Sequence, residues 1–149
     1  MMRMLLAGAL AAVALVQPAQ AKGYLAFATR NPGPMIAWYR SAFDLRIIRT
    51  IRPDNANLTV TILDGPLATV EILARLDLVP SDGMPERHVG IFKAGFEVDN
   101  LDPWITRWKA ANVDIAAGPF DEAQPPQRSV ILRDPDRNLI HIVAPLTPG

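Results

Sequence analysis

Ile131-Leu-Arg-Asp-Pro-Asp-Arg-Asn-Leu-Ile-His-Ile-Val-Ala144 is the stretch that decides the fold. It predicts two short strands joined by a tight turn at 134–138, because Pro fixes φ and Asp and Asn hydrogen-bond to their own backbone. The flanking segments are β-branched and apolar, as in strands that are buried on both faces. His141 is the polar residue inside the second strand, and a polar group there needs a partner or a function.

A similar pattern occurs about seventy positions earlier. Residues 62–66 again predict a turn, and residues 68–73 again form an apolar strand with one polar interruption, Glu71. Glu71 lies 70 positions before His141, and Tyr24 lies 69 positions before Lys93. The chain therefore contains two copies of one module, and two copies of this length indicate paired domains rather than a repeat array.

Each module is predicted to contain a strand, a helix and three further strands. The first module (22–75) has expected strands at 24–29, 45–52, 58–63 and 68–74 and a helix at 35–43. The second (91–149) has expected strands at 93–98, 113–116, 128–133 and 139–144, a helix at 102–112 and a long polar loop at 118–127. Residues 76–90, which hold Pro, Ser, Asp and Gly, are the expected linker.

The two helices have recognisable ends and buried sides. Asp102 is the expected N-cap of the second helix, with Pro103 at its first helical position. Trp38, Trp104 and Trp108 occupy helical positions and are expected in the core or at an interface. The expected fold class is α+β, with two tandem βαβββ modules.

The first 21 residues predict a signal peptide. A short positive start (Met1–Arg3) precedes an apolar run of about twelve residues, and Ala19-Gln-Ala21 has the form of a signal-peptidase site. The apolar run is too short to span a bilayer comfortably. We therefore expect cleavage after Ala21, export to a bacterial periplasm or the medium, and a mature domain of residues 22–149 that is not held in a membrane.

Composition excludes several classes of function. The 149 residues carry 15 basic and 15 acidic side chains, so no electrostatic signature of nucleic-acid binding is present. There is no cysteine, which rules out disulfides, thiolate metal sites and cysteine nucleophiles. No phosphate loop, metalloprotease motif or Ser-His-Asp order occurs.

The chain resembles the vicinal oxygen chelate superfamily in three features. These are the doubled module, Trp38-Tyr39 in the first helix, and Asp134-Pro-Asp-Arg-Asn138 before the last strand. The superfamily includes glyoxalase I, bleomycin-resistance proteins and extradiol dioxygenases. The resemblance covers residues 23 to 145. Arg137 stands where the family motif has glycine, and at a positive φ it would cost on the order of 1 kcal/mol.

The resemblance implies two half-barrels and four metal-ligand positions, which fall on Tyr24, Glu71, Lys93 and His141. Glu71 and His141 are ligand types that the family uses. Tyr24 is a poor ligand because its phenol has a pKa of about 10, and the Lys93 ammonium repels cations. Because alternate strand residues share a face, Glu97 joins this polar set, and Leu25, Phe27, Val70, Ile72, Phe96, Ile140 and Ile142 are expected on the opposite, core face.

Two readings of this set follow. In the first, Lys93 and Glu71 form an ion pair in place of a metal, and the protein binds a small molecule between the modules or across a homodimer, with no cofactor. In the second, Glu71 and His141 hold a divalent metal with a third ligand from Glu97 or His88, and the protein is a lyase or dioxygenase. A vestigial cleft in an interaction protein is a third possibility. Neither catalysis nor the ligand's identity can be read from the sequence.

Overall fold

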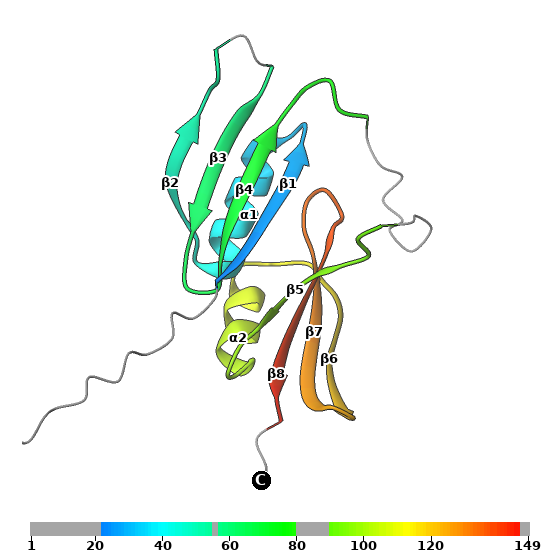
Figure 1. Ribbon diagram of the computed structural model, residues 1–149. Helices are drawn as coiled ribbons and strands as arrows, with labels where there is room; N and C mark the ends of the chain where they lie inside the picture. Colours follow the sequence, from blue (N-terminus) through cyan, green and yellow to red (C-terminus); the bar gives the residue numbers. More distant parts are fainter. Residues whose placement is uncertain (1–21, 55–56, 80–89, 147–149) are drawn as a thin grey trace, which may run out of the picture.

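The computed structural model describes residues 22–54, 57–79 and 90–146 (Figure 1). The expected signal peptide, most of the linker and His88 lie outside these residues. Within them, no helix is long and apolar enough to cross a membrane.

Two modules of the predicted type follow one another. The first comprises β1 (Gly23–Thr29), α1 (Pro32–Phe43), β2 (Arg46–Ile51), β3 (Thr59–Asp64) and β4 (Ala68–Ala74). The second comprises β5 (Ala94–Glu97), α2 (Asp102–Ala110), β6 (Ile115–Ala123), β7 (Pro126–Arg133) and β8 (Leu139–Pro145). The α+β prediction of two tandem βαβββ modules is confirmed.

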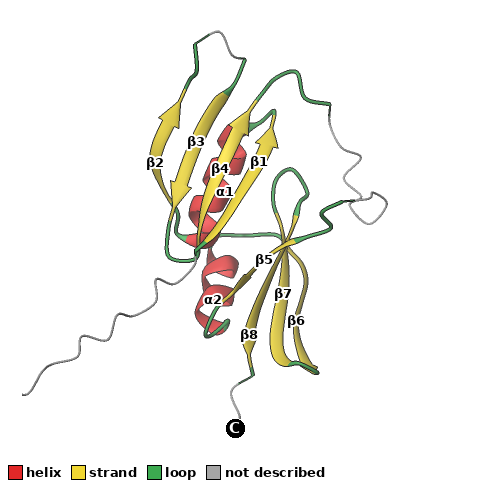
Figure 2. Ribbon diagram, in the orientation of Figure 1, coloured by secondary structure: helices red, strands yellow, loops and turns green. Residues whose placement is uncertain are grey.

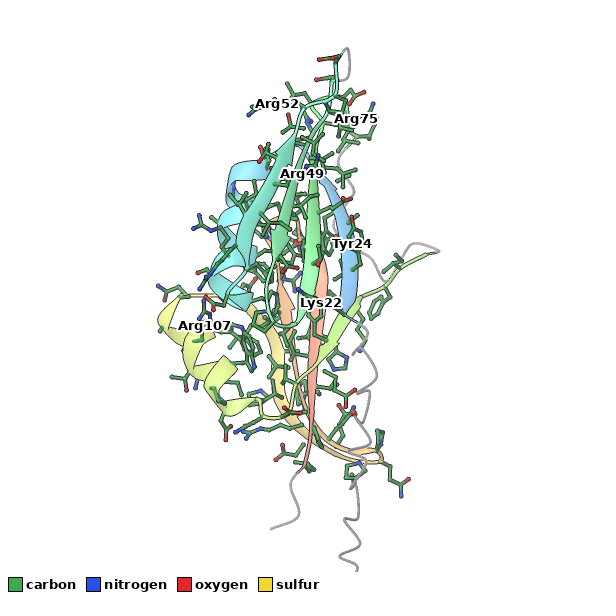
Figure 3. All side chains as sticks on the ribbon, turned by 60° about the vertical axis from the view of Figure 1, so that its left-hand side comes forward. Lys22, Tyr24, Arg49, Arg52, Arg75 and Arg107 are labelled. Atoms are coloured by element: carbon green, nitrogen blue, oxygen red, sulfur yellow. The ribbon has the colours of Figure 1, made fainter. Side chains whose placement is uncertain are left out.

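Each module forms a four-stranded sheet, in the orders β1-β4-β3-β2 and β5-β8-β7-β6. In both sheets the first strand pairs in parallel with the last, and the other pairs are antiparallel. The sheets lie one above the other in Figure 2, and the turned view of Figure 3 shows α1 and α2 on the same side of them. The last strand of each module is therefore central, which explains its continuous apolar sequence.

One hydrophobic core joins the two modules. The Phe43 ring packs edge-on against Phe96 of β5, with centroids 5.3 Å apart, and against Trp108 of α2 at 6.5 Å. The Trp108 indole N–H donates to the Ala42 carbonyl at 2.9 Å, and the Arg107 guanidinium donates to the Ser41 carbonyl at 2.7 Å. Trp108 is fully buried, whereas Trp38 and Trp104 are partly buried against this core, so all three have the expected role.

The turn at residues 134–138 is held to the first module by hydrogen bonds. Asp134 is only 3 % exposed. Its carboxylate accepts hydrogen bonds from the Tyr39 hydroxyl at 3.2 Å and from the backbone and side-chain nitrogens of Asn138, both at 2.8 Å. Arg137 has φ 71°, so the position does take the left-handed conformation for which glycine is favoured.

The predicted loop at 118–127 is wrong, because β6 and β7 form a hairpin across it. β6 is the edge strand of its sheet, where a proline removes no ladder hydrogen bond. Its pairing shifts between Ala117 and Phe120, at Gly118-Pro119. Gly118 has φ +95°, and a Cβ there would lie 2.8 Å from the Ser129 carbonyl oxygen. The Pro and Gly that indicated a loop therefore build a β-bulge.

The N-cap prediction for α2 is also wrong by one residue. The helix is preceded by Leu101, and Asp102 is its first residue. The Asn100 side chain accepts the Asp102 backbone N–H at 2.9 Å, so Asn100 takes the role that the pattern assigned to Asp102. The acidic Asp102 still lies in the first turn, where its negative charge interacts favourably with the helix dipole.

Candidate functional site

Both sheets have one face covered by helices and one open face. On β4 the residues Ala68, Val70 and Ile72 are buried, and the alternate residues Thr69 and Glu71 are less so. On β8, Ile140, Ile142 and Ala144 are buried, and His141 lies on the other face. The period of two therefore places the predicted polar residues away from the core, as expected.

Tyr24 and Glu71 lie on the open face of the first sheet. Their strands pair in parallel, with Tyr24 beside Thr69 and Ala26 beside Glu71. Tyr24 is 59 % exposed, and hydrogen bonding to the Glu71 carboxylate is the main cause that raises its pKa. Figure 3 shows Tyr24 and Lys22 on the side of the sheet away from α1. These two predicted residues act as a pair.

Lys93, Glu97 and His141 belong to the open face of the second sheet. Gly95 pairs with His141 and Glu97 with Val143, so the alternation places Lys93, Gly95 and Glu97 on the same side as His141. His141 is partly buried, and its pKa is lowered by burial and then by the Lys93 charge. The imidazole is therefore predominantly neutral at pH 7.

Glu122 on β6 is a member of this face that the sequence analysis missed. Its two carboxylate oxygens accept hydrogen bonds from the Ser129 hydroxyl at 2.7 Å and the Gln127 amide at 3.0 Å. Ser129 is 2 % exposed. These bonds, with smaller contributions from the charges of His141 and Lys93, lower the pKa of Glu122. The signal was hidden because residues 118–127 read as a loop.

The predicted ion pair between Lys93 and Glu71 is not formed, although the structure describes both residues. In the first module, Lys22 forms an ion pair with Asp64 at 2.5 Å, and the Asp64 carboxylate also accepts a hydrogen bond from the Thr69 hydroxyl. The Lys93 charge instead acts on His141 and Glu122 of its own sheet. The site is thus two polar groups, Tyr24–Glu71 on one sheet and Lys93–His141–Glu122 on the other.

The donor chemistry of these positions does not fit a divalent ion. No group of three or more His, Asp and Glu residues in the described ranges is arranged to hold a metal. At the four family positions only Glu71 and His141 are good metal ligands. The Lys93 ammonium also acts on the His141 imidazole and would repel a cation bound there. Two ligands fall short of the three that catalytic metal sites keep.

Two cavities open at the ends of the first sheet. One, of about 690 Å³, lies at the end of β1 between Thr29, Arg30, Leu78 and Asp136. The other, also of about 690 Å³, lies between Lys22, Leu67, Glu97 and Trp104. Glu97 is thus one of the residues that line the second cavity.

Comparison with known proteins identifies the family. The family model described as Glyoxalase/Bleomycin resistance protein/Dioxygenase superfamily matches residues 22–142. The chain belongs to this superfamily. No curated protein sequence matches the chain.

Solved structures agree on the fold. A glyoxylase/bleomycin resistance protein/dioxygenase domain from Frankia sp. EAN1pec has a TM-score of 0.69 at 14% identity, covering 89% of this chain and 96% of that one. TioX from Micromonospora sp. ML1 has 0.61 at 19% identity, covering 85% and 99%. A glyoxalase I variant from Zea mays has 0.68 at 15% identity, covering 83% of this chain but 45% of its own. Similarity at this level establishes the fold alone.

Proposed function

We propose that the mature chain is an exported superfamily member that binds a small molecule on the open faces of its two sheets without a metal ion. The observation that carries the proposal is the placement of Lys93 on the same open face as His141, which follows from the pairing of Gly95 with His141. There, burial and then the Lys93 charge lower the pKa of the imidazole. An ammonium beside the imidazole repels a cation and donates hydrogen bonds, so it favours a polar or anionic ligand.

The surrounding residues suit such a ligand. Gly95 beside His141 leaves no side chain on the floor of the face, and a Cβ there would lie 3.1 Å from the His141 carbonyl oxygen. Tyr24 and Glu71 add a phenol and a carboxylate from the other sheet. Donors and acceptors around an open floor are what a small-molecule site requires for orientation.

Ligand binding is tested by thermal shift of residues 22–149 against a panel of small polar metabolites. We expect at least one compound class to raise the Tm of the wild-type protein, because a ligand at 100 times its Kd stabilises the fold by about 2.7 kcal/mol. The Lys93→Ala, His141→Ala double variant should lose the shift, whereas Asp121→Asn, on the other face of β6, should keep it. No shift with any compound, or an equal shift in the double variant, would contradict the proposal.

Export is tested separately with the full chain of 149 residues. Produced in a bacterium, the protein should be recovered outside the cytoplasm, with Lys22 as its N-terminal residue. Recovery of the uncleaved chain from the cytoplasm would contradict this part of the proposal. The expected homodimer remains a prediction, which sedimentation of the mature protein measures.

A further inference from the structure

The open face of the second sheet separates its charges along the strand direction. One row across the sheet contains Glu97, Val143 and Ser129, in the registers of β5–β8 and β7–β8. Glu122 lies in the adjacent row on this face, with Gln127 and Pro145, and its carboxylate reaches back to accept the Ser129 hydroxyl at 2.7 Å. Glu97 and Glu122 therefore lie in adjacent rows, on the two edge strands of the sheet.

The next rows change in charge. His141 lies two residues from Val143, in a row with Gly95 and Ile131. Two residues further, alternation places Lys93 in the row of Leu139 and Arg133. The Arg133 guanidinium contacts Asp114 at 3.5 Å. Successive rows on one face are about 6.6 Å apart. At the backbone, Lys93 is therefore about 13 Å from Glu97 and about 20 Å from Glu122, with His141 between them.

Glu122 is built to accept a further donor. Ser129 binds one of its oxygens and Gln127 the other, which fixes the carboxylate plane and leaves a lone pair on each oxygen. Ser129 is almost fully buried, so this support is held rigidly by the sheet. A fixed, ionised carboxylate is a specific partner for an ammonium group.

We propose that Glu122 is a ligand-binding residue and that this face takes a zwitterionic amino carboxylate, with its ammonium at Glu122 and its carboxylate at Lys93. This inference rests on the proposed function and names its ligand class. His141 lies between the rows of Lys93 and Glu122, and both charges act on its ring, so a ligand held by both groups passes over the imidazole. Neutral His141 then contacts the middle of the ligand.

The test uses glycine, β-alanine, 4-aminobutyrate and 5-aminovalerate as probes, with butyrate and butylammonium as matched single-charge compounds. Binding to residues 22–149 is followed by NMR of the His141 ring. Because the ammonium adds a charge-assisted contact with Glu122, the best amino carboxylate should bind at least about tenfold tighter than butyrate. A dependence on chain length is expected, because the span between the two charges is fixed.

Glu122→Gln should abolish the advantage of the amino carboxylate over butyrate, and Lys93→Ala should weaken both. Asp121→Asn is the matched control, since Asp121 neighbours Glu122 but contacts Arg128 at 3.4 Å on the helix-covered face. Equal binding of butyrate and the amino carboxylates, no binding of any probe, or an unchanged preference in Glu122→Gln would overturn the inference. If the metabolite panel still yields ligands that depend on Lys93 and His141, the proposed function stands and the zwitterion class is wrong.

Discussion

Tyr39→Phe removes one hydroxyl from the contact that ties the Asp134 turn to the first helix. The hydroxyl donates to the Asp134 carboxylate at 3.2 Å, and both residues are buried. A hydrogen bond to a charged group contributes about 1.5–3 kcal/mol. Asp134 keeps two donors from Asn138 in the variant, so we expect the lower end, about 1.5 kcal/mol. For a domain of this size that is a Tm decrease of about 6 °C.

The assay is urea unfolding at pH 7 of wild type, Tyr39→Phe, Asp134→Ala and the double variant. The double-mutant cycle should give a coupling of at least about 1 kcal/mol between the two positions. Tyr24→Phe is the matched control, because an exposed hydroxyl should change stability by less than about 0.5 kcal/mol. A coupling near zero, or a loss in Tyr39→Phe no larger than in Tyr24→Phe, would refute the reasoning.

The same variant has a defined pH dependence. Burial raises the pKa of Asp134 above its ordinary value, and the Tyr39 hydroxyl opposes that rise. Because the pKa of Asp134 is higher in the folded state than in the unfolded state, the protein loses stability as the pH rises from the unfolded-state pKa through the folded-state pKa. Removing the hydroxyl raises the folded pKa further, so the cost of Tyr39→Phe should be full at neutral pH and should shrink as Asp134 is protonated. An unchanged cost at low pH would contradict this assignment.

Three further predictions follow from particular residues. Arg137→Gly should raise the free energy of unfolding by about 0.5–1 kcal/mol in urea, because glycine adopts φ 71° without a Cβ penalty; a loss of stability would contradict it. In NMR titrations, Lys93→Ala should raise the pKa of His141 and Glu122→Gln should lower it, because the two charges act on the ring in opposite senses. Since folding lowers the pKa of His141, this residue should reduce the stability of the protein as the pH falls from about 6.5. If neither variant shifts the pKa of His141, the two charges do not act on the ring. Trp108→Ala should cost about 3–5 kcal/mol by thermal or urea unfolding, because it empties a fully buried site and breaks the bond to Ala42; a loss below about 1 kcal/mol would contradict the shared core.

Local patterns were sufficient for much of the fold. The Asp134–Asn138 turn, the central apolar strands and the face that carries Glu71 and His141 follow from turn chemistry and a period of two. The 118–127 segment did not follow, because Gly and Pro in an edge-strand bulge have the same composition as a loop.

The candidate site depended more on tertiary structure. Glu122 has its role only because the hairpin brings Ser129 and Gln127 to its oxygens. The Lys93–Glu71 ion pair was predicted from equivalent positions in the repeat. It fails because those positions lie on different sheets, and the sequence does not set the distance between the sheets.

Metal content is the most direct test of the central claim that this site works without a metal. The mature protein, residues 22–149, is offered Zn, Ni, Mn and Fe(II) in turn, dialysed and measured by elemental analysis, with the Glu71→Ala, His141→Ala variant beside it. We predict the same substoichiometric content in both proteins. One metal per wild-type chain, lost in the variant, would contradict the account and would mean that Glu71 and His141 are metal ligands despite the charge of Lys93.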